Sequence, residues 1–182
     1  MNLVNVADYR IKGINYYWKR REKFNLSEDE LRSVGVQGNN ALVDEILIPK
    51  LKEANQIFKQ HGYEIIVKDA YRSPELYQLV KDKRYEIEGK ESTDKTFNPI
   101  RMPHASGRVV DINLVSLGSG EEVEMWDKKD WPDGAFINCY QGKPDSRSKE
   151  FQRLQDLMVS TMVSLGFKLG LKNECWHFEY KV

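Results

Sequence analysis

Two histidines and one aspartate are the residues of this sequence with the clearest capacity for chemistry. His104 and Asp111 lie in the segment MPHASGRVVD, and His177 lies near the end of the chain in NECWHFEY. Two imidazoles and one carboxylate are the ligand composition of a catalytic zinc site, in which a fourth position stays open for water. The same ligands also suit iron, so the residues by themselves leave the metal open.

Each of these residues has a simpler explanation when it is considered alone. Asp111 could lie on the solvated face of an edge strand, with Val110, Ile112 and Leu114 in the core, and His177 could be a buried histidine with satisfied hydrogen bonds. A carboxylate within such an apolar strand is costly to bury, however, unless it is paired or bound to a cation. The combination therefore favours a metal site, and the open fourth position favours catalysis over a structural role.

Glu174 is the candidate for proton transfer, because the water of a catalytic zinc site needs a carboxylate nearby. It precedes His177 by three residues, and residues three apart in a regular strand point to opposite faces. We therefore predict that Glu174 lies in the turn before the strand, or that a bulge shifts the alternation. The alternation of the strand itself places Trp176, Phe178 and Tyr180 on one face and Cys175 with His177 on the other.

Arg72 is the candidate for a group that stabilises negative charge. It stands between a predicted strand and a predicted helix, where Ser73 would cap the helix and Pro74 would occupy its first turn. A cation is disfavoured near the positive end of a helix dipole, so surface electrostatics do not explain this position. Arg72 could instead face a developing oxyanion, although an ordinary ion pair would also account for it.

The elements that must position these residues follow from the hydrophobic pattern. Helical spacing predicts helices within residues 44–62, from Pro74 to about Tyr85, and over residues 151–165. Strands are predicted at residues 63–68, 108–115 and 173–180, with a hairpin to a short strand at 121–125. Residues 88–107 and 126–147 are expected to be long irregular segments. This order predicts an α+β fold with a mostly antiparallel sheet packed against helices.

Composition narrows the class of protein. A chain of 182 residues, 40% hydrophobic and 31% charged, suits one globular domain over residues 1–182. Lys+Arg and Asp+Glu both number 28, so the balance predicts neither nucleic acid nor an anionic membrane surface as a partner. The sequence shows no apolar run long enough for a membrane span and no secretory signal, so we expect a cytoplasmic protein. Cys139 and Cys175 are expected to be reduced thiols.

The combined motifs resemble those of the zinc D-Ala-D-Ala metallopeptidases. The shared pattern is H-x6-D followed by E-x-W-H, with D-x-Y-R upstream, and the resemblance covers about residues 40–180. This family includes the D-alanyl-D-alanine dipeptidases of vancomycin resistance, D,D-carboxypeptidases and phage endolysins, and the sonic hedgehog signalling domain shares its fold. The resemblance implies one zinc ion held by His104, Asp111 and His177. It also implies Glu174 as general base and acid, and Arg72 as stabiliser of the tetrahedral intermediate.

The resemblance also bears on the substrate. In the dipeptidases, an aspartate after the hairpin meets the free ammonium of the substrate, and Asp130 stands at the matching position here. Asp127 and Asp133 are close enough to be alternatives. Met102 replaces a serine that usually helps the family to grip its substrate, which leaves the substrate more open than the metal.

We therefore predict zinc-dependent hydrolysis of a D-amino-acid peptide bond, with the D-Ala-D-Ala dipeptide as the favoured substrate. One alternative is a D,D-carboxypeptidase or endopeptidase acting on peptidoglycan stem peptides, which usually needs export or phage-assisted access. A second alternative is a zinc-containing binding domain that has lost catalysis, as in the signalling relatives. The presence of both Glu174 and Arg72 argues against this second alternative.

Overall fold

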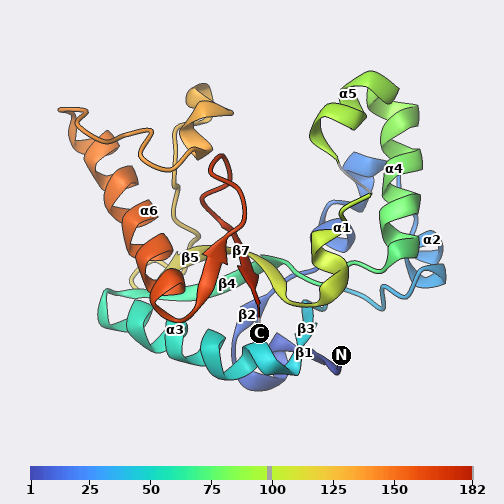
Figure 1. Ribbon diagram of the computed structural model, residues 1–182, viewed down its shortest axis with the longest axis horizontal. Helices are drawn as coiled ribbons and strands as arrows, with labels where there is room; N and C mark the ends of the chain where they lie inside the picture. The colour runs from blue at the N-terminus through green and yellow to red at the C-terminus, as the bar shows by residue number, and fades with distance from the viewer. Residues whose placement is uncertain (98–99, 182) are drawn as a thin grey trace.

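The computed structural model describes residues 1–97 and 100–181. Its centre is a sheet with the strand order β2-β4-β5-β7-β6 (Figure 1). The strands are β2 (Lys12–Gly13), β4 (Tyr63–Asp69), β5 (Val109–Ser116), β6 (Phe167–Leu169) and β7 (His177–Tyr180). The pair β2–β4 is parallel, whereas the other three pairs of neighbours are antiparallel. The predicted α+β fold with a mostly antiparallel sheet is therefore confirmed.

Two long helices cover the apolar face of this sheet. Helix α3 (Ile48–Gln60) begins with Pro49 in its first turn, so this proline starts the helix and does not kink it. Helix α6 (Ser146–Ser164) is capped by Asp145, whose carboxylate accepts a hydrogen bond of 2.8 Å from the Ser148 amide. Both helices share one buried core with strands β4 and β5. This layer makes β4 and β5 a rigid base for the residues on their opposite face.

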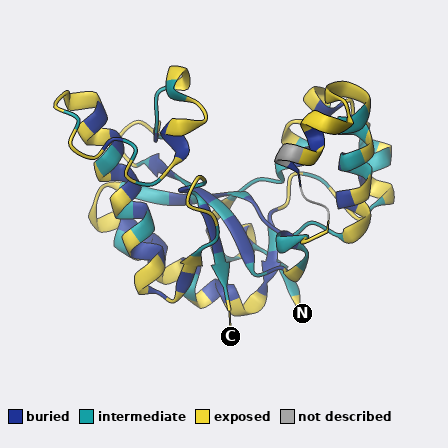
Figure 2. Ribbon diagram, turned by 45° about the horizontal axis from the view of Figure 1, so that its top comes forward, coloured by how far each residue is buried: buried dark blue, intermediate teal, exposed yellow. Residues whose placement is uncertain are grey.

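A second apolar cluster lies apart from the first. It joins the N-terminal helices α1 (Tyr16–Lys19) and α2 (Glu28–Ser33) to α4 (Pro74–Glu88), and it includes Tyr17 and Tyr77. Figure 1 shows this group and the neighbouring α5 (Lys90–Thr96) as one arm beside the sheet. Figure 2 shows buried residues inside this arm as well as along the sheet. The sequence patterns had predicted α4 but not the N-terminal half of this cluster.

The shorter elements differ most from the predictions. Strands β1 (Leu3–Asn5) and β3 (Leu42–Asp44) form a separate antiparallel pair, and β6 adds an edge to the main sheet; none of the three was predicted. The irregular segment predicted at 88–107 contains α5 and a 3-10 turn at Pro103–Ser106. The short strand predicted at 121–125 is reduced to an isolated bridge between Val115 and Glu122. Among the described residues, no helix has both the length and the apolar character needed to cross a membrane.

Candidate active site

Asp111 lies on β5, in the middle of the sheet. Its strand neighbours Val110 and Ile112 are at most 1% exposed and face the core, so Asp111 points to the opposite face, as predicted. The alternative of an edge strand is wrong, because β5 is paired with β4 on one side and with β7 on the other. In this register Asp111 lies directly between Asp69 of β4 and His177 of β7. The three side chains therefore project from one face of the sheet.

The position of Asp69 depends on an irregularity of β4. The register between β4 and β5 shifts between Val67 and Asp69. Such a bulge adds a residue on one strand and redirects the side chains that follow it. Asp69 consequently faces the same side as Asp111 instead of following the regular alternation.

His104 reaches the same place from the 3-10 turn that precedes β5. Its buried ring donates from Nδ1 to the Ala70 carbonyl at 2.9 Å, and its backbone amide donates to the Tyr77 hydroxyl at 3.1 Å. The Nε2 atom is left facing Asp111, with 3.7 Å between Nε2 and Oδ1. Burial and the charge of Arg72 lower the pKa of His104 to about 3. The imidazole is therefore neutral, which is the form that ligates metals.

Gly107 makes the connection from His104 to β5 possible. Its φ of 68° lies in the left-handed region that favours glycine. A Cβ at this position would also lie 3.2 Å from the Asp44 backbone nitrogen. Both observations show that this sharp turn requires a glycine.

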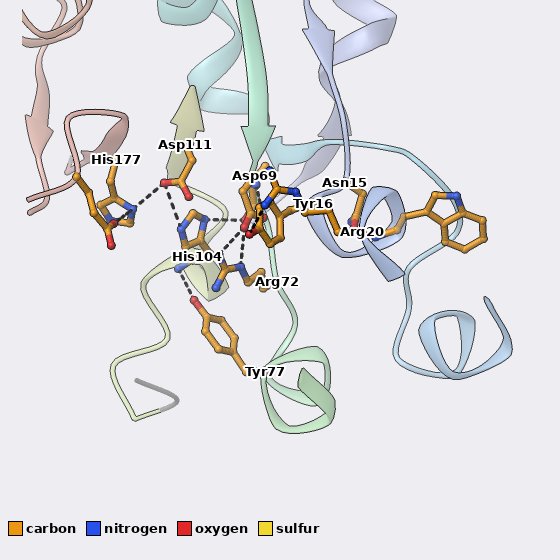
Figure 3. Close-up of polar contacts among 12 residues, drawn as sticks. Asn15, Tyr16, Arg20, Asp69, Arg72, Tyr77, His104, Asp111 and His177 are labelled. Carbon is orange, nitrogen blue, oxygen red and sulfur yellow. Dashed lines mark hydrogen bonds and ion pairs between the residues drawn. The ribbon is translucent and has the colours of Figure 1, made fainter. Parts of the chain in front are cut away.

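His177 completes the cluster as the first residue of β7. Its Nδ1 lies 2.8 Å from Asp111 Oδ1, and its ring centroid lies 5.1 Å from that of His104 (Figure 3). One ligand atom from each of the three residues can be chosen so that all lie within 4.8 Å of one another. Burial lowers the pKa of His177, but the hydrogen bond and charge of Asp111 outweigh this effect and raise it. The cluster has the donor atoms and the spacing to hold one metal ion.

Glu174 lies before β7, in the place that the alternation argument required. The His177 amide donates to the Glu174 carbonyl at 3.1 Å, and the Glu174 carboxylate lies 3.7 Å from His177 Nδ1. Burial, followed by the charge of Asp111, raises the pKa of Glu174. Glu174 is thus beside the cluster, on a turn and not on a strand.

The predicted faces of this segment are wrong for two residues. Cys175 is buried in the sheet core together with Phe178, whereas Trp176 lines the same cleft as His177. The reason is that the strand begins only at His177, so its alternation does not extend back to Cys175 and Trp176. Both cysteines, Cys139 and Cys175, are free thiols, as predicted.

Arg72 is fixed by an ion pair and two aromatic rings. Its Nε and Nη2 donate to Asp69 Oδ2, the former at 3.1 Å. Its Cζ lies 5.2 Å from the Tyr17 ring centroid and 5.3 Å from that of Tyr77. Ser73 and Pro74 cap and start α4 as predicted. Arg72 thus forms the ion pair that the sequence left open as an alternative, and this pair engages Nε and Nη2 of the guanidinium.

Sequence reasoning missed the three residues that hold Arg72. Asp69 belongs to the D-x-Y-R segment, and its position three residues before an arginine at a strand end was the available signal. Tyr77 lies one helical turn after Ser73, and an aromatic residue there could have been predicted to face Arg72. Nothing in the sequence pointed to Tyr17, because its short helix has no recognisable periodicity.

These residues line one cleft of about 590 Å³. The metal-ligand cluster, Arg72 and Glu174 all border it. The N-terminal segment contributes Tyr16, Arg20 and Phe24, and three tryptophans, Trp126, Trp131 and Trp176, line another part. The tryptophan ring centroids are 4.9 to 6.1 Å apart. The cleft is much larger than the cluster itself, so it can hold an organic substrate.

The structure does not bring Asp130 to this cleft. The Asp130 carboxylate accepts a hydrogen bond of 2.9 Å from the Tyr140 hydroxyl, which satisfies a buried phenol. Asp127 pairs with Arg147 at 3.3 Å, and Asp133 is exposed; neither residue lines the cleft. Met102 has a φ of 39° and packs against the second apolar cluster.

The site combines three metal-binding side chains, one of them a neutral buried histidine, with a neighbouring carboxylate and a fixed arginine. This combination defines a metal-dependent hydrolase. The chain matches the family model described as D-ala-D-ala dipeptidase (Peptidase_M15) over residues 18–181. It belongs to this family of zinc metallopeptidases.

Solved structures match the chain at low sequence identity. One is an alanine variant of the vancomycin-resistance D,D-pentapeptidase VanY from the VanB-type resistance cassette, in complex with Zn(II). Its TM-score to this chain is 0.50 and its sequence identity is 18%, over 78% of this chain and 74% of that chain. Another is VanYB in complex with D-alanine-D-alanine, with a TM-score of 0.43 and 19% identity, over 77% of this chain and 72% of that chain. A search of curated protein sequences gave no match.

Proposed function

We propose that the protein hydrolyses the peptide bond between two D-alanine residues, with a zinc ion held by His104, Asp111 and His177. The observation that carries this proposal is the convergence of their ligand atoms within 4.8 Å on the floor of a cleft. The donors fit zinc, because His104 is held neutral with Nε2 facing the cluster. Membership of the D-ala-D-ala dipeptidase family supports zinc over iron.

The residues of the chain divide the remaining chemistry between them. Bound zinc would supply a Lewis acid that polarises the scissile carbonyl and lowers the pKa of water. Glu174, beside the cluster, takes the proton of the attacking water and passes it to the departing amine. Arg72 donates from the part of its guanidinium that Asp69 does not engage to the oxygen that becomes negative. The Tyr17 and Tyr77 rings keep this donor in place, so it needs no rearrangement during the reaction.

The free D-Ala-D-Ala dipeptide is the substrate that the sequence favours. The family description supports it. A cytoplasmic location, as expected from the sequence, would bring the enzyme and the free dipeptide together. Asp130 is the proposed partner of the dipeptide ammonium, but it would have to release Tyr140 and move into the cleft to reach it.

One observation favours a second candidate, a D,D-carboxypeptidase that acts on longer stem peptides. Each of the four carboxylates among the described residues of the cleft already has a partner. Asp69 pairs with Arg72, Glu122 pairs with Lys68, and Asp111 and Glu174 both lie within ion-pair distance of His177. None is free to pair with a substrate ammonium. A longer peptide has no ammonium at this position, and a cleft of about 590 Å³ has room for several residues.

Metal analysis and two substrates test these proposals. We expect one zinc per chain, and release of free D-Ala from the D-Ala-D-Ala dipeptide or from a muramyl pentapeptide. Cleavage of the dipeptide alone selects the dipeptidase, and cleavage of the pentapeptide alone selects the carboxypeptidase. Zinc binding without cleavage of either substrate would overturn the proposed activity in favour of a binding domain.

Glu174→Ala tests the mechanism. We expect this variant to bind zinc but to lose turnover, because the proton acceptor is removed while the three ligands remain. Glu121→Ala is a matched control, since Glu121 is exposed and does not line the cleft. Near-normal turnover by Glu174→Ala would show that the proposed mechanism is wrong.

A further inference from the structure

Four cationic side chains line the active-site cleft in the described part of the chain: Arg20, Lys68, Arg72 and Arg84. Three of them have a carboxylate partner. Lys68 pairs with Glu122, Arg72 with Asp69, and Arg84 with Glu88 at 2.7 Å. Arg20 is the exception, because no acidic residue among the described ones lies within ion-pair distance of it.

Arg20 is nevertheless held in a defined position. Its Nη1 donates to the Tyr16 hydroxyl at 2.9 Å, and its Cζ lies 4.6 Å from the centroid of the Tyr16 ring. Tyr16 opens α1, whose N-cap Asn15 accepts a hydrogen bond of 3.0 Å from the Trp18 amide. A guanidinium that is already stacked and hydrogen-bonded loses less conformational entropy when it binds an anion.

Arg20 is connected to the catalytic groups through the neighbouring tyrosine. The rings of Tyr16 and Tyr17 are 5.2 Å apart, and Tyr17 in turn lies under Arg72. Figure 3 shows Tyr16 and Arg20 on the side of Arg72 that is away from His177. A substrate whose scissile carbonyl reaches Arg72 can therefore extend towards Arg20 on the side away from His177.

We propose that Arg20 binds a carboxylate of the peptide substrate and so selects acidic over neutral peptides. This inference rests on the proposed D,D-peptidase function. The planar guanidinium fork of arginine can bind a carboxylate through two parallel hydrogen bonds, and Arg20 is exposed despite its aromatic contact. Lys68, Arg72 and Arg84 are each already paired with a carboxylate of the chain, so Arg20 is the cationic side chain of the described cleft that is left for a carboxylate of the substrate.

A stem peptide offers two sources for this carboxylate. One is the C-terminal carboxylate of the last D-residue, which the free dipeptide also has. The other is the side or α-carboxylate of an acidic residue further from the scissile bond. The same Arg20 chemistry serves either source, and substrates with one carboxylate amidated tell them apart.

The test compares Arg20→Gln with the wild-type zinc enzyme on four substrates. These are D-Ala-D-Ala, its C-terminal amide, a muramyl pentapeptide, and that pentapeptide with its internal carboxylate amidated. We expect Arg20→Gln to raise KM about fivefold with little change in kcat, which is the size of one partly exposed ion pair. Amidating the carboxylate that Arg20 binds should raise the wild-type KM by a similar factor and abolish the difference between wild type and variant.

Two further variants separate charge recognition from a structural effect. Arg20→Lys should recover part of the affinity, because the charge remains while the fork is lost. Arg32→Gln is the matched control: Arg32 also stacks on an aromatic ring of the N-terminal segment, at 5.6 Å from Trp18, but it pairs with Glu28 and lies outside the cleft. A wild-type KM for Arg20→Gln on every cleaved substrate, or an equal effect of Arg32→Gln, would overturn the proposal.

Calorimetric titration of the same peptides into the zinc-loaded proteins makes the inference independent of turnover. Weaker binding by Arg20→Gln than by wild type supports it, and equal binding contradicts it. If the wild-type protein cleaves no D,D-peptide, the proposed function fails, and the titration still decides whether Arg20 binds a carboxylate.

Discussion

Gly170 supports the ring of His177 so closely that a single methyl group there should damage the metal site. The residue follows β6, and its amide donates to the His177 carbonyl at 3.0 Å. A Cβ on Gly170 would lie 2.3 Å from His177 Cδ2 and 2.8 Å from Nε2. We therefore predict that Gly170→Ala displaces the imidazole, although alanine changes neither charge nor any ligand.

The size of the effect follows from these distances. Ordinary carbon–carbon contacts are about 3.5 Å or longer, so the ring must retreat by about 1 Å. The ring cannot move freely, because Nδ1 is fixed at 2.8 Å from Asp111. Metal–ligand distances tolerate only about 0.2 Å. Disturbing the groups that orient a ligand typically costs about 10- to 100-fold in metal affinity, and misplacement by about 1 Å can cost about 100-fold in rate.

Competition with a chromophoric chelator measures the zinc affinity, and D-Ala release measures the turnover. Gly118→Ala is the matched control, because a Cβ there meets Ser116 Oγ only at 3.7 Å, an ordinary contact. We expect the control to behave as wild type and Gly170→Ala to remain folded by circular dichroism. If Gly170→Ala binds zinc and turns over substrate as wild type does, His177 is not a ligand fixed by this packing.

Three further predictions concern other parts of the molecule. Asp69→Asn should lower kcat about tenfold at unchanged zinc affinity, because Arg72 loses the charged partner that orients it; kinetics and chelator competition check this. The hydrogen bond from Lys83, followed by those from Ser27 at the helix cap, lowers the pKa of Glu30 from 4.5 to about 2. The ionised Glu30 carboxylate therefore stabilises the fold fully above pH 4.5, and this stabilisation disappears as the pH falls towards 2. Urea unfolding should accordingly show a difference between wild type and Glu30→Gln at pH 7 that shrinks at pH 3. Leu51→Ala, at a fully buried position of α3, should reduce the free energy of unfolding by about 2–5 kcal/mol in the same assay.

The parts of the fold that could be predicted are those with long, regular patterns. Helices α3 and α6 and strands β4 and β5 have many apolar residues at one period, and the structure places them close to the predicted ranges. Helix α5, with the sequence KESTDKT, has no apolar stripe, and β6 has three residues, so neither produces a period that can be detected. The N-terminal elements are short for the same reason.

The residues of the site could be predicted where their residue type alone limits their chemistry. His104, Asp111 and His177 were found because few residue types bind metals, and the position of Glu174 followed from the geometry of a strand. No sequence pattern predicts the bulge that turns Asp69 towards Asp111. The contact between Tyr17 and Arg72 likewise has no sequence pattern that predicts it. Asp130 was assigned because it stands at the position that matches an aspartate after the hairpin in the dipeptidases, but a loop of this length can place such a residue in many directions.

The proposed catalytic residues are held by two separate apolar clusters. Asp111 and His177 stand on strands of the sheet core, whereas Arg72 is held between Tyr17 and Tyr77 of the other cluster. Regions with separate cores can open with separate free energies. Partial denaturation that opens the arm of α1, α2, α4 and α5 first would thus remove the donor for the oxyanion, while Asp111 and His177 would remain on the sheet to hold the metal. Metal content would then overstate the fraction of active enzyme, and activity would be the more sensitive measure of the native state.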